Sequence, residues 1–171
     1  NVATAHDFGQ FSLAYAGLLL FLGAQRALVG ETLLVRYSRT GELTRRVAGA
    51  SLGATALVAV PAVLLLAAGA FLSAPEDAGL WLIMAAVSPF VLLQDSIRYL
   101  FICQARPAKA LLIDGIWAVG SISTMIVTAR TGGGLTLVLV WWGAGAAVAL
   151  AVGLALARTV PAVIHGARWL W

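Results

Sequence analysis

Seven polar side chains that could bind an anion or form ion pairs occur near the ends of long apolar segments. They are two arginines, three acids and two glutamines: Arg26, Arg98, Glu31, Asp95, Asp114, Gln25 and Gln94. A guanidinium group matches phosphate through two parallel hydrogen bonds. The arginines and glutamines are therefore candidates for binding an anionic head group or for forming a gate. The acids are candidate ion-pair partners that would hold the arginines when no ligand is bound.

The composition indicates what kind of protein must position these residues. The chain has 171 residues, of which 61% are hydrophobic and 11% charged, and its mean hydropathy is +0.96. A soluble domain carries about 25% charged residues, so we interpret the chain as a polytopic membrane protein. No segment alternates apolar and polar residues as barrel strands do. The expected fold class is therefore all-α, a bundle of transmembrane helices.

Five segments are long and apolar enough to cross a bilayer, which requires about 20 residues per helix. They lie at about 8–29, 47–73, 79–103, 110–128 and 135–157. We expect them to form one transmembrane bundle over 1–158. Residues 159–171 are expected to form a cytoplasmic interfacial tail, since their tryptophans and arginines suit a helix lying on the membrane surface.

The basic residues predict the orientation of the bundle. Eight lie in the links after spans one and three or in the tail after span five: Arg36, Arg39, Arg45, Arg46, Arg106, Lys109, Arg158 and Arg168. The opposite links hold one, Arg130. The positive-inside rule then places the C-terminus in the cytoplasm and the N-terminus outside. Because this distribution explains the high pI, nucleic acid is not an expected partner. An external N-terminus without a signal peptide also predicts a preceding helix, so we expect a fragment of a larger protein.

The candidate charges are expected to share one layer near the cytoplasmic boundary. At 1.5 Å per residue from Gly79, Asp95 lies about 24 Å and Arg98 about 28 Å along its helix. These two residues are at i,i+3 and face the same way, and Arg26 and Asp114 fall at similar depth. Such a layer is typical of a latch or of the mouth of a water-filled cavity. The simpler alternative is that each charge is solvated separately at the interface.

Other motifs predict packing rather than chemistry. Gly49 and Gly53 have the GxxxG spacing, which lets backbones approach closely. His6 and His165 fall on opposite sides of the predicted membrane, and Cys103 is the single cysteine. The sequence contains neither HExxH nor GxSxG. We therefore expect no enzyme activity, no metal site and no cofactor.

Two blocks carry a family resemblance, "FSLAYAGLLLFLGAQRALVGETLLVRYS" and "LLQDSIRYLFICQARPAKALLIDGIWAV". They resemble the N-terminal half of bacterial polysaccharide (O-antigen type) flippases of the multidrug/oligosaccharidyl-lipid/polysaccharide exporter superfamily. The resemblance implies helices two to six of a two-lobed transporter in the bacterial cytoplasmic membrane. Its implied partners are membrane lipid, lipid-linked (undecaprenyl-diphosphate) oligosaccharide and the remaining helices of the full-length transporter. It also implies that Arg26 and Arg98 contact the diphosphate.

Two other functions remain open. One is a drug or cation antiporter of the same superfamily, which would require acids deep within the spans, where this sequence has none. The other is a small membrane scaffold or assembly subunit that oligomerises through its glycine-rich faces.

Overall fold

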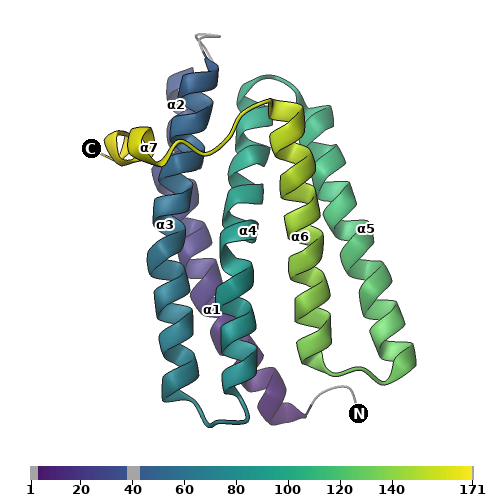
Figure 1. The fold of residues 1–171 in the computed structure, drawn as a ribbon. Helices are drawn as coiled ribbons and strands as arrows, with labels where there is room; N and C mark the ends of the chain where they lie inside the picture. Colours follow the sequence, from purple (N-terminus) through teal and green to yellow (C-terminus); the bar gives the residue numbers. More distant parts are fainter. Residues whose placement is uncertain (1–3, 38–42, 171) are drawn as a thin grey trace.

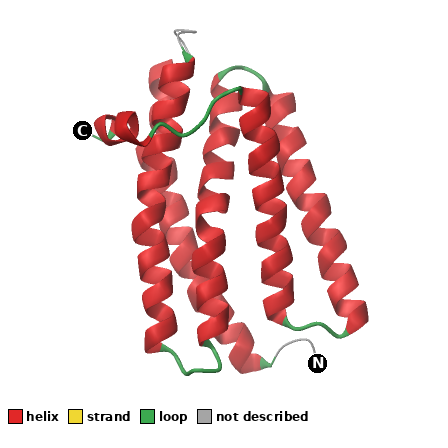
Figure 2. Ribbon diagram, in the orientation of Figure 1, coloured by secondary structure: helices red, strands yellow, loops and turns green. Residues whose placement is uncertain are grey.

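The computed structural model describes residues 4–37 and 43–170, and within them the chain is helical without strands (Figure 2). Five helical segments are long and apolar enough to span a membrane. They are Ala5–Tyr37, Arg45–Leu72, Ala78–Cys103, Pro107–Thr131 and Leu135–Ala157. The expected all-α bundle is confirmed. The last four segments match the predicted spans to within three residues at either end.

The first segment is longer than the predicted span. It consists of α1 (Ala5–Gln25), a π-helical turn η1 (Arg26–Gly30) and α2 (Glu31–Tyr37). The charges after Val29 had suggested a link, but Leu33 is buried with Val29 against Ala54 and extends the helix. At 1.5 Å per residue this segment measures about 50 Å, so it is longer than a hydrocarbon core of about 30 Å. One end must therefore extend beyond the membrane.

The other helices are α3 (Arg45–Leu72), α4 (Ala78–Cys103), α5 (Pro107–Thr131), α6 (Leu135–Ala157) and the short α7 (Val163–Trp169). Helix α4 packs against α1, α3, α5 and α6, and two thirds (67%) of its most apolar window is buried. Helix α5 lies at the edge of the bundle (Figure 1), and only 11% of its window is buried. The central α4 is thus the helix best shielded from lipid.

The turns divide the bundle into two ends (Figure 1). The start of α1, the α3–α4 turn and the α5–α6 turn lie at one end, while α2, the α4–α5 turn and α7 lie at the other. The described basic residues of the links and tail gather at the second end, and Arg130 lies at the first. The basic residues are thus distributed between the two ends as the positive-inside rule requires for the predicted orientation. The orientation in a membrane remains a prediction.

The predicted glycine pair packs against the C-terminal segment. Gly49 accepts a 2.8 Å hydrogen bond from the Ala162 backbone N–H. A Cβ atom at Gly53 would overlap the backbone of Ala162, and one at Gly166 would overlap Gly53. Small residues thus let the α7 segment lie directly on α3. The tail is therefore packed onto the bundle at the end where a surface helix was expected.

Candidate functional site

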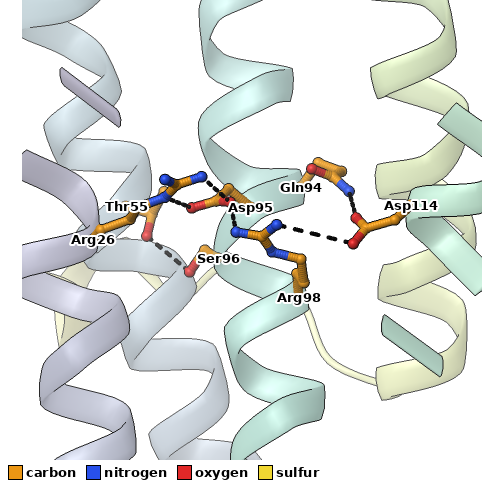
Figure 3. A network of polar contacts seen from close by, with 7 residues as sticks. All are labelled: Arg26, Thr55, Gln94, Asp95, Ser96, Arg98 and Asp114. Carbon is orange, nitrogen blue, oxygen red and sulfur yellow. Dashed lines mark hydrogen bonds and ion pairs between the residues drawn. The ribbon is translucent and has the colours of Figure 1, made fainter. Parts of the chain in front are cut away.

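A single buried carboxylate binds two guanidinium groups between α1 and α4 (Figure 3). Arg26 donates from Nε to Asp95 Oδ2 at 2.9 Å and from Nη2 to Oδ1 at 3.0 Å. Arg98 donates from Nη2 to the same Oδ1 at 2.5 Å. The Asp95 side chain is only 7% exposed, whereas those of Arg26 and Arg98 are 38% and 30% exposed. The acid is therefore enclosed, while both of its cationic partners remain partly accessible.

The contacts continue from α4 to α5. Gln94 donates from Nε2 to Asp114 Oδ1 at 2.8 Å, and Arg98 Nη1 lies 4.0 Å from Asp114 Oδ2. We call Arg26, Asp95, Arg98 and Asp114 the four-charge network. Its formal charges sum to zero, and it joins α1 and α5 to the central α4. The structure thus brings together four of the five charged residues that the sequence placed in one layer.

The helix geometry changes at Arg26, directly after α1. The π turn begins at Arg26, and the Glu31 N–H donates to the Arg26 carbonyl. At its end, Gly30 lies against the ring of Tyr99, where an added Cβ would be 3.0 Å from the ring Cγ. The Arg98 guanidinium lies 5.5 Å from the centre of the same ring. π turns inserted in α-helices are frequent at functional sites. No pattern in the sequence indicated this turn or the contacts of the Tyr99 ring.

The remaining predicted residues, Gln25 and Glu31, have opposite environments. Gln25 is fully buried, and neither its amide oxygen nor its nitrogen has a hydrogen-bond partner among the described residues. Arg98 Nε is likewise buried and has no partner in this part of the chain. Buried polar atoms normally have partners, so this layer has unused hydrogen-bonding capacity. Glu31 is exposed, and it makes no ion pair with any residue that the structure describes. It therefore lies outside the network.

Buried hydroxyl groups extend the polar layer to α3. Thr55 Oγ1 donates to Ser96 Oγ at 3.0 Å and lies 3.2 Å from the Ser51 carbonyl (Figure 3). All three of these residues are fully buried. They were not predicted because hydroxyl groups, unlike charged groups and amides, are common within apolar spans. The i,i+4 spacing of Ser51 and Thr55 in a span without charges was the available signal.

A second polar contact closes the opposite end of the bundle. His6 Nε2 lies 2.9 Å and 3.1 Å from the two carboxylate oxygens of Asp77, and Trp81 Nε1 donates to Gln10 Oε1 at 3.2 Å. These contacts join the start of α1 to the α3–α4 turn and the start of α4. His6 is thus far from α7, which contains His165 (Figure 1).

Comparison of the chain with models of known protein families, with curated proteins and with solved structures finds no match. What bears on function is therefore the geometry of the chain itself. That geometry offers two partly exposed guanidinium groups whose shared counter-ion is a buried acid.

Proposed function

We propose that the chain is part of a membrane transporter and that the four-charge network is its gate. The observation that carries this proposal is the sharing of Asp95 by Arg26 and Arg98 between membrane-spanning helices. Ionisable groups within such helices are costly, and they commonly mark the path of a substrate or ion. A network that joins three helices through one carboxylate can open when a competing anion takes its place.

The competing anion would be a phosphate group. Guanidinium binds phosphate with the same parallel hydrogen bonds that Arg26 now makes to Asp95. Both arginine side chains are about one-third exposed, so a ligand can approach them while the acid stays enclosed. A phosphate that binds the arginines more tightly than Asp95 does would shift the population toward a state in which α1 is released from α4.

The substrate class follows from the family resemblance of the two sequence blocks. It suggests lipid-linked oligosaccharide on an undecaprenyl-diphosphate carrier, moved across the bacterial cytoplasmic membrane by alternating access. The remaining helices of a full-length transporter would then supply the facing half of the cavity. The concentration of basic residues at the α4–α5 end supports placing this end, with the C-terminus, in the cytoplasm.

The commitment of Asp95 favours this proposal over a cation antiporter. A carboxylate that binds a proton or a metal cation in a transport cycle must be available to it, and Asp95 already accepts hydrogen bonds from two guanidinium groups. A scaffold or assembly role would require neither partly exposed arginines nor an enclosed acid between them.

The test measures binding of undecaprenyl diphosphate to the 171-residue chain in maltoside micelles, with undecaprenol as the uncharged control lipid. Arg26→Gln and Arg98→Gln should each weaken binding of the diphosphate about tenfold or more, since each removes a charge-assisted contact. Asp95→Asn should strengthen binding, because it removes the competing anion. Arg36→Gln, an exposed arginine of α2, is the matched control.

The Asp95→Asn variant separates a gate from a purely structural ion pair. If Asp95 only stabilises the fold, its replacement weakens or leaves unchanged the binding of the diphosphate. That result in a folded variant would refute the gate. Unchanged transport by a full-length protein carrying Arg26→Gln and Arg98→Gln would refute head-group binding by these arginines.

A further inference from the structure

We propose that a cavity at the α4–α5 end of the bundle binds a phosphate-bearing anion at a site separate from the four-charge network. This basic cavity has a volume of about 520 Å³, within the range of small-molecule sites. Its polar lining consists of four cationic side chains and one amide: Arg45, Arg106, Lys109, Arg158 and Gln104. Among the residues that the structure describes, its lining includes no carboxylate. The inference does not depend on the proposed function.

The four cations come from three different elements. Arg45 begins α3, Arg106 and Lys109 lie at the start of α5, and Arg158 caps the end of α6. Lys109 is held in place, with Nζ 3.4 Å from the Leu156 carbonyl and 5.7 Å from the centre of the Phe101 ring. None of the four forms an ion pair within residues 4–37 and 43–170. Within these described residues, the cavity thus has positive charge on several sides that no ion pair compensates.

The backbone around the cavity is strained at two positions. Ala105 and Arg158 are the non-glycine residues with positive φ in the described chain, at 53° and 51°. Arg158 lines the cavity, and Ala105 lies between Gln104 and Arg106, which also line it. This left-handed conformation is unfavourable for an L-residue that has a Cβ atom. Strain of this kind concentrates at ligand-binding and active sites.

Both strained residues end a helix in the same way. At the end of α4, the Ala105 N–H donates to Ile102 and the Arg106 N–H to Phe101, at 3.0 and 2.9 Å. At the end of α6, the Arg158 N–H donates to the Ala155 carbonyl at 3.2 Å. The N–H of the next residue forms the second hydrogen bond of a Schellman motif. Glycine is the residue usually found at the left-handed position of this motif.

The opposite end of the bundle follows that usual rule. Helix α5 ends on Gly132, with φ 71°, and the following N–H of Gly133 donates to Thr128 at 3.0 Å. The same turn is thus made by glycine away from the cavity and by Ala105 and Arg158 beside it. The turn itself gives no reason for a side chain at position 158. The position of Arg158 in the lining of the basic cavity gives one.

The chemistry of the lining selects phosphate. Guanidinium groups bind phosphate oxygens bidentately, and ammonium groups bind them as point charges. Three arginines and one lysine in a cavity of this size can surround a phosphodiester or diphosphate. Anionic phospholipids at a membrane surface and soluble phosphate or pyrophosphate share this chemistry, and experiment can distinguish them.

The experiment measures thermal stability and ligand binding of the 171-residue chain in maltoside micelles. The probes are inorganic phosphate and pyrophosphate against chloride at matched ionic strength, and phosphatidylglycerol against phosphatidylcholine. Arg106→Gln should weaken binding of the anionic probe on the order of tenfold. Two control variants lose one positive charge, as Arg106→Gln does. They are Arg36→Gln in α2, outside the cavity lining, and Arg130→Gln at the opposite end of the bundle.

Arg158→Gly distinguishes a ligand site from a helix cap. It relieves the left-handed strain, so the melting temperature without ligand should rise while the response to the anionic probe is lost. If Arg158 serves only to neutralise the end of α6, Arg158→Gly lowers the melting temperature without ligand and leaves probe binding intact, which overturns the proposal. Binding of phosphatidylglycerol alone identifies a lipid head group, and binding of the soluble anions identifies a soluble ligand. Equal losses in the Arg36→Gln control, or binding of neither probe class, also overturn it.

Discussion

The contact between Arg26 and Asp95 should contribute measurably to the stability of the bundle, and a double-mutant cycle can isolate its energy. The cycle uses Arg26→Gln, Asp95→Asn and the double variant. The pair has two hydrogen bonds of 2.9 and 3.0 Å, and a hydrogen bond to a charged group contributes about 1.5–3 kcal/mol. Side-chain hydrogen bonds between membrane helices average only about 0.6 kcal/mol, and the Arg26 side chain is 38% exposed. We therefore expect a coupling energy of about 1–2 kcal/mol.

The two single variants should differ in a defined order. Arg26→Gln leaves Asp95 paired with Arg98 at 2.5 Å, so the expected loss is about 1–2 kcal/mol. Asp95→Asn removes the described ion-pair partner of Arg26 and leaves Arg98 with Asp114, 4.0 Å away. Breaking a buried pair by removing one partner costs about 3–5 kcal/mol. Because the arginines here are partly solvated, we expect about 2–4 kcal/mol for Asp95→Asn.

The assay is equilibrium unfolding in mixed maltoside and dodecyl sulfate micelles, followed by circular dichroism of the helices. Arg36→Gln, an exposed arginine on the same segment as Arg26, should change the free energy of unfolding by less than about 0.5 kcal/mol. A coupling below about 0.3 kcal/mol, or a loss for Arg26→Gln that equals or exceeds the loss for Asp95→Asn, would refute the central role of the carboxylate.

Further predictions concern two glycines and one buried hydroxyl group. Gly53→Val should displace the C-terminal segment from α3, because an added Cβ overlaps the backbone of that segment, and proteolysis should then cleave near Trp169 faster. Gly23→Ala should instead stabilise α1 by about 0.5–1 kcal/mol, because Gly23 has open space around it. Thr55→Val should lower the free energy of unfolding by about 1–2 kcal/mol, since it leaves the buried Ser96 hydroxyl without this partner. Thr55→Ser, which keeps the hydroxyl, should restore much of that loss in the same unfolding assay.

The positions of the spans were predictable because they depend on local composition. The arrangement of the helices around one another was not predictable in this way. Segments Ala78–Cys103 and Pro107–Thr131 have nearly equal mean hydropathy, 1.7 and 1.8, yet 67% of the first window and 11% of the second are buried. Burial of a membrane helix depends on which neighbours it finds. Lipid and protein interiors are both apolar, so hydropathy alone does not distinguish a central helix from a peripheral one.

The candidate site divides in the same way. The depth of each charge follows from its distance along a helix, so the common layer of Arg26, Asp95, Arg98 and Asp114 was predictable. The direction in which a side chain points around the helix depends on packing. Glu31 lies near this depth but is exposed, whereas Gln25 is fully buried. The π turn between them is defined by hydrogen bonds that no residue pattern in the sequence indicates.

The two proposed anion sites lie close together along α4 but should bind independently. Arg98 of the network and Gln104 of the basic cavity are six residues apart, or about 9 Å along the helix. The network is electrically neutral, so an anion must displace Asp95 before it can bind there. The described lining of the basic cavity includes no acid that an anion would have to displace, so an anion can bind there without disrupting the helix contacts. The effects of Asp95→Asn and Arg158→Gly on phosphate binding should therefore be additive. Asp95→Asn should strengthen binding at the four-charge network, and Arg158→Gly should abolish binding at the basic cavity. Strong non-additivity would mean that the two groups of cations act as a single site.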